Sequence, residues 1–258
     1  MNYTKLIKEF SELCKARGFS KKGKAFSRCI GDGIYQNITY TEKYYIDTDS
    51  PEYSDANRKS PSISFGCWSM YSDIYPEQFT PFGREHSGLL SPEMIIGKNP
   101  KNYFKGFGSQ YKIMVEQGLD LLDSITTQEQ LLSVTYKLIS VQYGDSFPHM
   151  SELAIPHIIC GERNKALDRL YSIYVRSCIN FFDKYRHLKE SGQYDKYIEK
   201  LNEHEASIEM YTLFINRIVC NREDELKEYM LSYLERNIQY AKENKIAFAD
   251  NFAPLLKK

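Results

Sequence analysis

The chain has 258 residues, 42% of them hydrophobic, and its 34 Lys and Arg residues balance its 34 Asp and Glu residues. This composition excludes a disordered chain, because it supplies enough apolar side chains for a core of ordinary size. The zero net charge argues against nucleic acid as a bulk partner, because no overall positive field would attract a polyanion.

The six cysteines are scattered singly, and no C-x-x-C pair occurs. This usage is typical of buried thiols in a reducing compartment. Charged residues interrupt the first ten positions, and no run approaches the roughly 18–20 apolar residues that span a bilayer. We therefore expect a cytoplasmic protein that does not enter the membrane.

The first part of the chain predicts one helix followed by β-strands. Residues 3–17 place apolar side chains at helical spacing. From Lys24 onward the apolar residues alternate, and residues 31–33, Gly-Asp-Gly, predict a hairpin turn between two strands. A third strand is expected at residues 62–68. The Pro-containing residues 72–108 predict mostly loop, with a short edge strand at 94–96.

Beyond residue 109 the apolar spacing becomes helical throughout. Thr126 and Glu129 predict a capping box for one helix, and Asn221 is expected to cap the last one. Three long amphipathic helices in succession predict a helical lobe.

These patterns together predict an α+β fold. It consists of an N-terminal helix and a small antiparallel sheet of three or four strands, followed by an all-helical C-terminal lobe. The expected domains are an α+β lobe at residues 1–125 and a helical lobe at residues 126–258.

Residues 18–24 match the first seven positions of a phosphate-binding P-loop. The match ends at Ala25, which lacks the hydroxyl that would bind Mg²⁺, and the predicted order is helix to strand instead of strand to helix. The same turn is rich in basic residues and remains a candidate anion-binding site. Its members are Lys21, Lys22, Lys24 and Arg28. The alternative is a solvated helix end and turn.

Metal and catalytic motifs are sparse. His149, His157 and Cys160 are the one local group of ligand-type side chains, and core packing is the favoured use for them, so we predict no metal and no cofactor. Neither a G-x-S-x-G elbow nor a supported Cys-His nucleophile occurs in the sequence. Enzyme activity stays open, leaning towards none, because dispersed residues can form an active site.

Four side chains on the second and third strands predict a surface for a protein partner. Tyr35, Thr39, Trp68 and Met70 lie on the side of the strands opposite their apolar residues. If helices cover only one face of the sheet, these four are exposed on the other face. The alternative is that residues 72–108 cover them.

Residues 18–28 read Gly-Phe-Ser-Lys-Lys-Gly-Lys-Ala-Phe-Ser-Arg, between an amphipathic helix and a hairpin. This segment resembles the bacterial family called domain of unknown function 4304, whose opening typically reads G-F-x-K-K-G-x-x-F-x-R. The strand at 63–68 and the segment 84–90 are also similar. The segment 84–90 has two additional residues, and Tyr103 and Phe104 stand where the family has paired tryptophans.

The resemblance covers about residues 1–140 and implies a fold but no agreed activity. With the family comes the looser expectation of a small neutralising protein that accompanies a bacterial toxin.

The sequence therefore predicts a non-catalytic protein-binding module, with an immunity-type inhibitor of a toxin as its narrower form. The absence of catalytic motifs and the 21 tyrosines motivate this prediction, because Tyr serves both cores and interfaces. One alternative is an enzyme or anion-binding protein that uses the basic turn at 21–28. Another is a structural subunit that self-associates through its helical lobe.

Overall fold

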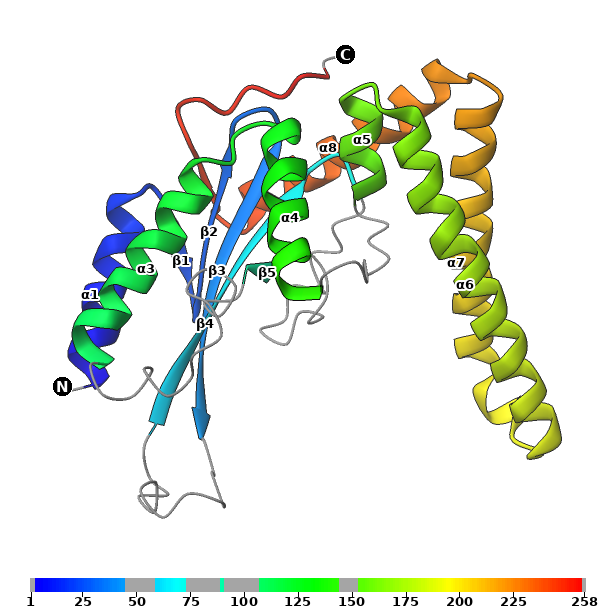
Figure 1. The fold of residues 1–258 in the computed structure, drawn as a ribbon, viewed down its shortest axis with the longest axis horizontal. Coiled ribbons are helices and arrows are strands. Elements are labelled where there is room, and N and C mark those ends of the chain that lie inside the picture. The colour runs from blue at the N-terminus through cyan, green and yellow to red at the C-terminus, as the bar shows by residue number, and fades with distance from the viewer. Residues whose placement is uncertain (1–2, 45–58, 73–88, 91–106, 144–152, 257–258) are drawn as a thin grey trace.

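The computed structural model describes residues 3–44, 59–72, 89–90, 107–143 and 153–256. The chain begins with a helix and a β-rich segment (Figure 1). The elements of this segment are α1 (Tyr3–Ala16), β1 (Ser20–Lys22), β2 (Ala25–Ile30), β3 (Ile34–Tyr44), β4 (Lys59–Ser69) and β5 (Leu89–Leu90). The strands pair antiparallel in the order β1-β2-β3-β4-β5.

The rest of the described chain is helical except for one short strand. Its elements are α3 (Phe107–Asp123), α4 (Gln128–Tyr143), α5 (Ala154–Ile159), α6 (Arg163–Glu190), α7 (Tyr194–Val219), α8 (Glu223–Glu243) and β6 (Ala247–Phe248). Strand β6 returns to the sheet and pairs parallel with β2, at Arg28 and Cys29.

Both faces of the sheet are covered at its centre, because the described side chains of β2, β3 and β4 alternate between two hydrophobic clusters. Phe26 and Ile38 pack in the cluster that includes side chains of α1, α3 and α4. Tyr35 and Cys29 point the other way, into the cluster that includes side chains of α5, α6, α7 and α8. The sheet is thus the middle layer of the molecule (Figure 1).

Gly118 lets α3 lie close to the sheet. A Cβ atom at this position would come 2.4 Å from the Phe65 ring on β4. A larger side chain would push the helix away from the strand.

Helices α6 and α7 form a long antiparallel hairpin that extends away from the sheet at one end of the molecule (Figure 1). Helix α8 leads the chain back. The side-chain amide of Asn237 on α8 is buried, and its nitrogen donates hydrogen bonds to the carbonyl oxygens of Met70 and Ser72, at 2.8 and 3.1 Å. These bonds attach the helical region to the end of β4.

The predicted fold class is confirmed: an N-terminal helix and a small antiparallel sheet precede a helical C-terminal region. The three predicted strands correspond to β2, β3 and β4. The edge strand expected at 94–96 lies outside the described residues. The boundary expected at residues 125 and 126 stays a prediction, and the structure adds that residues 247–248 belong to the sheet.

Two predicted helix caps are wrong by one residue. The capping box of α4 joins Thr127 and Gln130, because the Thr127 hydroxyl accepts the Gln130 N–H and the Gln130 side chain accepts the Thr127 N–H, both at 3.1 Å. The residue at the N-cap of α8 is Arg222, whereas Asn221 has a φ of +54° at the end of α7. None of the described helices combines the length and apolar character needed to cross a bilayer.

Candidate functional site

The three lysines of the basic turn are exposed at the edge of the sheet, on β1 and in the turn to β2. The ammonium group of Lys22 donates to the side-chain oxygen of Asn244, at the end of α8. The ammonium group of Lys21 lies 5.5 Å from the centroid of the Phe26 ring. An anion site made of Lys21, Lys22 and Lys24 stays a prediction, which a thermal-shift screen with phosphorylated compounds tests.

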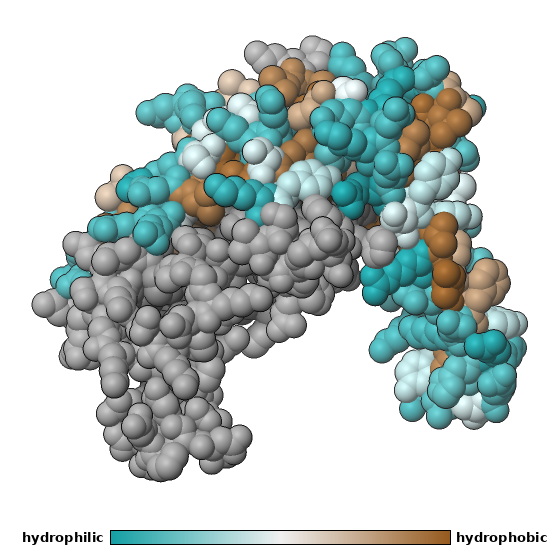
Figure 2. All heavy atoms as spheres, viewed as in Figure 1, coloured by the Kyte–Doolittle hydropathy of each residue, from teal (hydrophilic) through white to brown (hydrophobic). Residues whose placement is uncertain are grey.

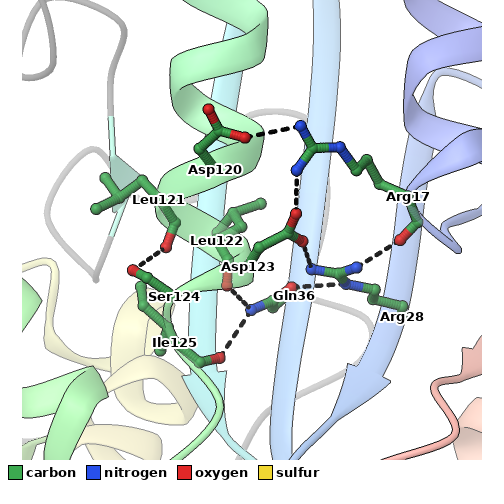
Figure 3. Close-up of polar contacts among 9 residues, drawn as sticks. All are labelled: Arg17, Arg28, Gln36, Asp120, Leu121, Leu122, Asp123, Ser124 and Ile125. Atoms are coloured by element: carbon green, nitrogen blue, oxygen red, sulfur yellow. Dashed lines mark hydrogen bonds and ion pairs between the residues drawn. The ribbon is translucent and has the colours of Figure 1, made fainter.

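Arg28 does not share that surface. It is 5% exposed, and its guanidinium lies 4.2 Å from the centroid of the Phe19 ring. Its Nε donates to Gln36 at 2.8 Å, and its two terminal nitrogens donate to the Arg17 carbonyl and the Asp123 carboxylate (Figure 3). The predicted role of Arg28 in an anion site is therefore corrected, because its side chain points into the protein and its donors are used there.

The contacts of Arg28 belong to a network that holds the C-terminal end of α3 (Figure 3). Arg17 pairs with Asp120 at 2.7 Å and also with Asp123, and these hydrogen bonds, Asp120 first, raise the pKa of Arg17. The Gln36 amide donates to the carbonyl oxygens of Leu122 and Ile125, at 2.6 and 3.0 Å. Leu122 lies in the last turn of α3 and Ile125 follows its end, so the Gln36 amide holds this end of the helix against β3.

Charge within the network balances, because the two guanidinium groups face two carboxylates. A bound anion would have to compete with Asp120 and Asp123 for the same donors. The geometry is that of a structural link between α1, the sheet and α3.

The predicted protein-binding surface on the sheet is corrected at two of its four residues, Tyr35 and Met70. Tyr35 is 6% exposed and Met70 is 1% exposed, and the Tyr35 hydroxyl donates to Ser27 Oγ at 2.9 Å. The Tyr35 and Trp68 rings lie 5.9 Å apart, and Trp68 and Thr39 are half-buried. Tyr35 and Met70 belong to the core, because the C-terminal helices fold back onto this face of the sheet, and Trp68 packs against the same cluster.

His157 on α5 is fully buried and joins three helices. Its Nε2 lies 2.6 Å from the Tyr136 hydroxyl on α4, and its Nδ1 lies 2.6 Å from the Glu162 carboxylate at the start of α6. Arg169 donates to the same hydroxyl at 3.2 Å. Burial lowers the pKa of the imidazole, although the Glu162 hydrogen bond acts in the opposite direction. Both ring nitrogens have partners, so the arrangement is a structural link.

The candidate zinc group considered in the sequence does not form around His157. Cys160 is exposed, and His149 lies outside the described residues. Within the part of the chain that the structure describes, no three His, Cys, Asp or Glu side chains gather as metal ligands do.

The strongest candidate site is an apolar surface on α6, which we call the outer face of α6. It consists of Tyr171, Val175, Ile179 and Phe182, whose side chains are between 45% and 67% exposed. Large apolar side chains reach the surface along the α6–α7 hairpin (Figure 2). Exposed apolar side chains grouped in this way are a feature of surfaces on which another macromolecule docks.

The hairpin presents this face on an ordered support. The other side of α6 packs on α7, where the Phe181 ring lies 5.8 Å from the His204 ring and the Tyr185 ring lies 5.6 Å from the Tyr194 ring. Leu170 and Leu188 are buried at the two ends of the helix.

The sequence contains a signal for this face. Apolar residues cover an arc of α6 wider than contact with α7 uses, and the part of the arc beyond that contact is the outer face.

A scan against protein-family models and searches of curated proteins and of solved structures each found no match. The family resemblance of residues 1–140 stays an expectation.

Proposed function

We propose that this chain is a non-catalytic protein-binding module and that the outer face of α6 is its binding surface. The single observation behind the proposal is the exposure of four large apolar side chains on one side of one helix. Burying such a side chain is worth on the order of 1.5–3 kcal/mol, so leaving four exposed is costly unless a partner covers them.

The rigidity of the hairpin supports the same function. A helix already held by α7 loses little conformational entropy when a partner docks, so more of the burial energy is available for affinity. Arg28 and His157 support the non-catalytic part of the proposal. Both are buried, and their polar groups bind other residues of the fold.

An immunity-type role, in which the bound protein is a toxin, is the narrower form of this proposal. It rests on the family resemblance alone.

The test compares the full chain with two variants that carry the same added charge. Phe182→Glu places a carboxylate within the outer face. Asn180→Glu places one on an exposed position of the same helix, nine residues from Tyr171 and therefore about 180° around the helix. Circular dichroism checks that both variants keep the wild-type helicity.

Each protein is immobilised and used to capture partners from a lysate of the source cells, and the affinity of any captured protein is then measured by calorimetry. We expect wild type and Asn180→Glu to bind the same protein and Phe182→Glu to lose it. A monomeric wild-type chain that captures nothing, or three chains that bind equally, would contradict the proposal.

A further inference from the structure

We infer that the outer face of α6 pairs with the same face of a second copy of this chain, with the two helices antiparallel. The inference rests on the proposed function and names the partner. Its first support is periodicity. A row of five residues along the edge of the face nearer α7 is spaced alternately by four and three, which is the spacing of a helix–helix seam. The seam residues are Tyr171, Val175, Cys178, Phe182 and Tyr185. Tyr171, Val175 and Phe182 belong to the outer face, whereas Cys178 is half-buried and Tyr185, 39% exposed, also contacts Tyr194 of α7.

These residues are also symmetric about the middle of the face, between positions 176 and 177. Antiparallel pairing about that point places Tyr171 opposite Phe182 of the second copy, and Val175 opposite Cys178, since both pairs are centred between positions 176 and 177. Each contact then occurs twice, as a two-fold interface requires. The aromatic rings lie at the ends of the pairing, and the smaller side chains lie in the middle.

Charge complementarity selects this direction of pairing. Asp168 continues the seam towards the start of α6, and Arg186 lies beside its other end. About the same centre, Asp168 lies opposite Tyr185 of the second copy, next to Arg186, so antiparallel pairing brings the acidic end of one helix beside the basic end of the other. Parallel pairing would instead place Asp168 beside Asp168. Opposite charges favour the first arrangement, and like charges oppose the second.

Arg186 is free to take part in this contact. It already pairs with Asp183 on its own helix at 3.0 Å, but the two side chains are 70% and 62% exposed, and such surface pairs contribute little. A partner helix can therefore draw the guanidinium towards Asp168 at small cost.

Sedimentation velocity of the full chain over a range of concentrations tests the inference. We expect a dimer, and we expect Val175→Glu and Phe182→Glu each to weaken self-association about 30-fold or more, as loss of an interface hot spot does. Asn180→Glu is the matched control and leaves the dimer unchanged. A chain that stays monomeric at the highest concentration, or a dimer that Phe182→Glu leaves intact, overturns the inference.

A charge exchange tests the direction of pairing. Asp168→Arg and Arg186→Asp each weaken the dimer, and the double variant Asp168→Arg/Arg186→Asp restores it. Failure of the double variant to recover affinity, with wild-type helicity retained, overturns the antiparallel arrangement.

Cross-linking provides a second test of direction. In a background with Cys160→Ser and Cys220→Ser, we expect Val175→Cys to allow an intermolecular disulfide with Cys178 of the second copy. Cross-linking of equal yield through Cys178 alone would indicate parallel helices, because antiparallel pairing keeps those two thiols in different layers, beyond disulfide reach.

The capture experiment separates this inference from the proposed function. A wild-type monomer that still binds a different protein through Phe182 overturns self-pairing and leaves the proposed function standing. A wild-type monomer that binds nothing overturns both.

Discussion

Arg28 and Asp123 form an ion pair that joins β2 to the last residue of α3 across 95 positions of sequence. The Arg28 side chain is 6% exposed, whereas the Asp123 side chain is 33% exposed. The buried guanidinium therefore depends on a carboxylate that sits at the protein surface.

Removing that carboxylate leaves Arg28 buried without its counter-charge. We expect Asp123→Ala to lower the free energy of unfolding by about 2–3 kcal/mol, somewhat less than for a fully buried pair because water reaches Asp123. The matched control is Asp120→Ala on the same helix, which removes an exposed partner of Arg17 and costs below about 1 kcal/mol. Urea unfolding followed by circular dichroism measures the free energy of unfolding of both variants. Equal losses of stability would contradict the expectation that only Asp123 neutralises a buried guanidinium.

Gly31 lies at the start of the turn between β2 and β3, against the backbone of Thr126. Its φ is +57°, and a Cβ atom there would lie 1.7 Å from the Thr126 carbonyl oxygen, which accepts the Asp32 N–H at 2.9 Å. We expect Gly31→Ala to destabilise the protein by at least about 3 kcal/mol, because the turn must move away from the loop before α4.

Gly23→Ala separates crowding from backbone strain. Gly23 also has a positive φ, of +60°, but nothing lies within 4 Å of an added Cβ. Its cost should be about 1–2 kcal/mol, from the left-handed backbone alone. Thermal unfolding measures the two variants side by side. A Gly31→Ala protein as stable as Gly23→Ala would contradict the close packing of Gly31 against the Thr126 carbonyl.

The capping box of α4 predicts that Thr127 stabilises the protein more than Glu129 does. Thr127→Ala removes the acceptor of the Gln130 N–H and should cost about 1 kcal/mol. Glu129→Ala, at the position expected from sequence, removes an exposed side chain outside the box and should cost less, because only the interaction of its carboxylate with the N-terminal end of the helix dipole is lost. A larger loss of stability in Glu129→Ala than in Thr127→Ala would contradict this capping box and favour the one expected from sequence.

His157 makes stability depend on pH. Burial lowers its pKa below the ordinary value of 6.5, so the folded protein holds it neutral while the unfolded chain protonates it. The contribution of neutral His157 is fully present above about pH 6.5 and is lost as the pH falls below that value, by at most about 1.4 kcal/mol per pH unit. The pKa of Glu162 is also lowered, first by Lys165 and then by His157, so its contribution is lost only below about pH 4.5.

The measurement is the free energy of unfolding of wild type and His157→Gln between pH 5 and pH 8. We expect the wild type to be more stable at pH 8 and the difference to narrow as the pH falls below 6.5. A difference that does not change with pH would show that His157 does not titrate between the two states.

Much of the candidate site could be read from α6 alone. The alternation of four and three residues from Tyr171 to Tyr185 is a property of the sequence, and so are the opposite charges of Asp168 and Arg186 near its two ends. What the sequence could not show is which side of α6 meets α7. Both sides are apolar, and only the position of Phe181 against His204 leaves Phe182 exposed.

For the sheet, the sequence indicated which way the side chains point but not what covers them. Alternation along β3 indicated correctly that Ile38 and Tyr35 point to different faces, because side chains on a strand have a period of two. It could not indicate that both faces are covered, since that depends on Asn237 and α8 returning to β4 from a distant part of the chain. The prediction for Arg28 failed for a similar reason, because its partner Asp123 lies 95 residues away in the sequence.

The sequence by itself determined the elements and their order: a helix, a β-hairpin with a third strand, and then helices. Local spacing carries that information, because a helix repeats every 3.6 residues and a strand every two. Only the tertiary structure decided which polar side chains are buried and which apolar side chains are exposed, because burial depends on contacts between residues far apart in the chain. Arg28 and Phe182 show this most plainly, since the charged side chain is inside and the aromatic one is outside.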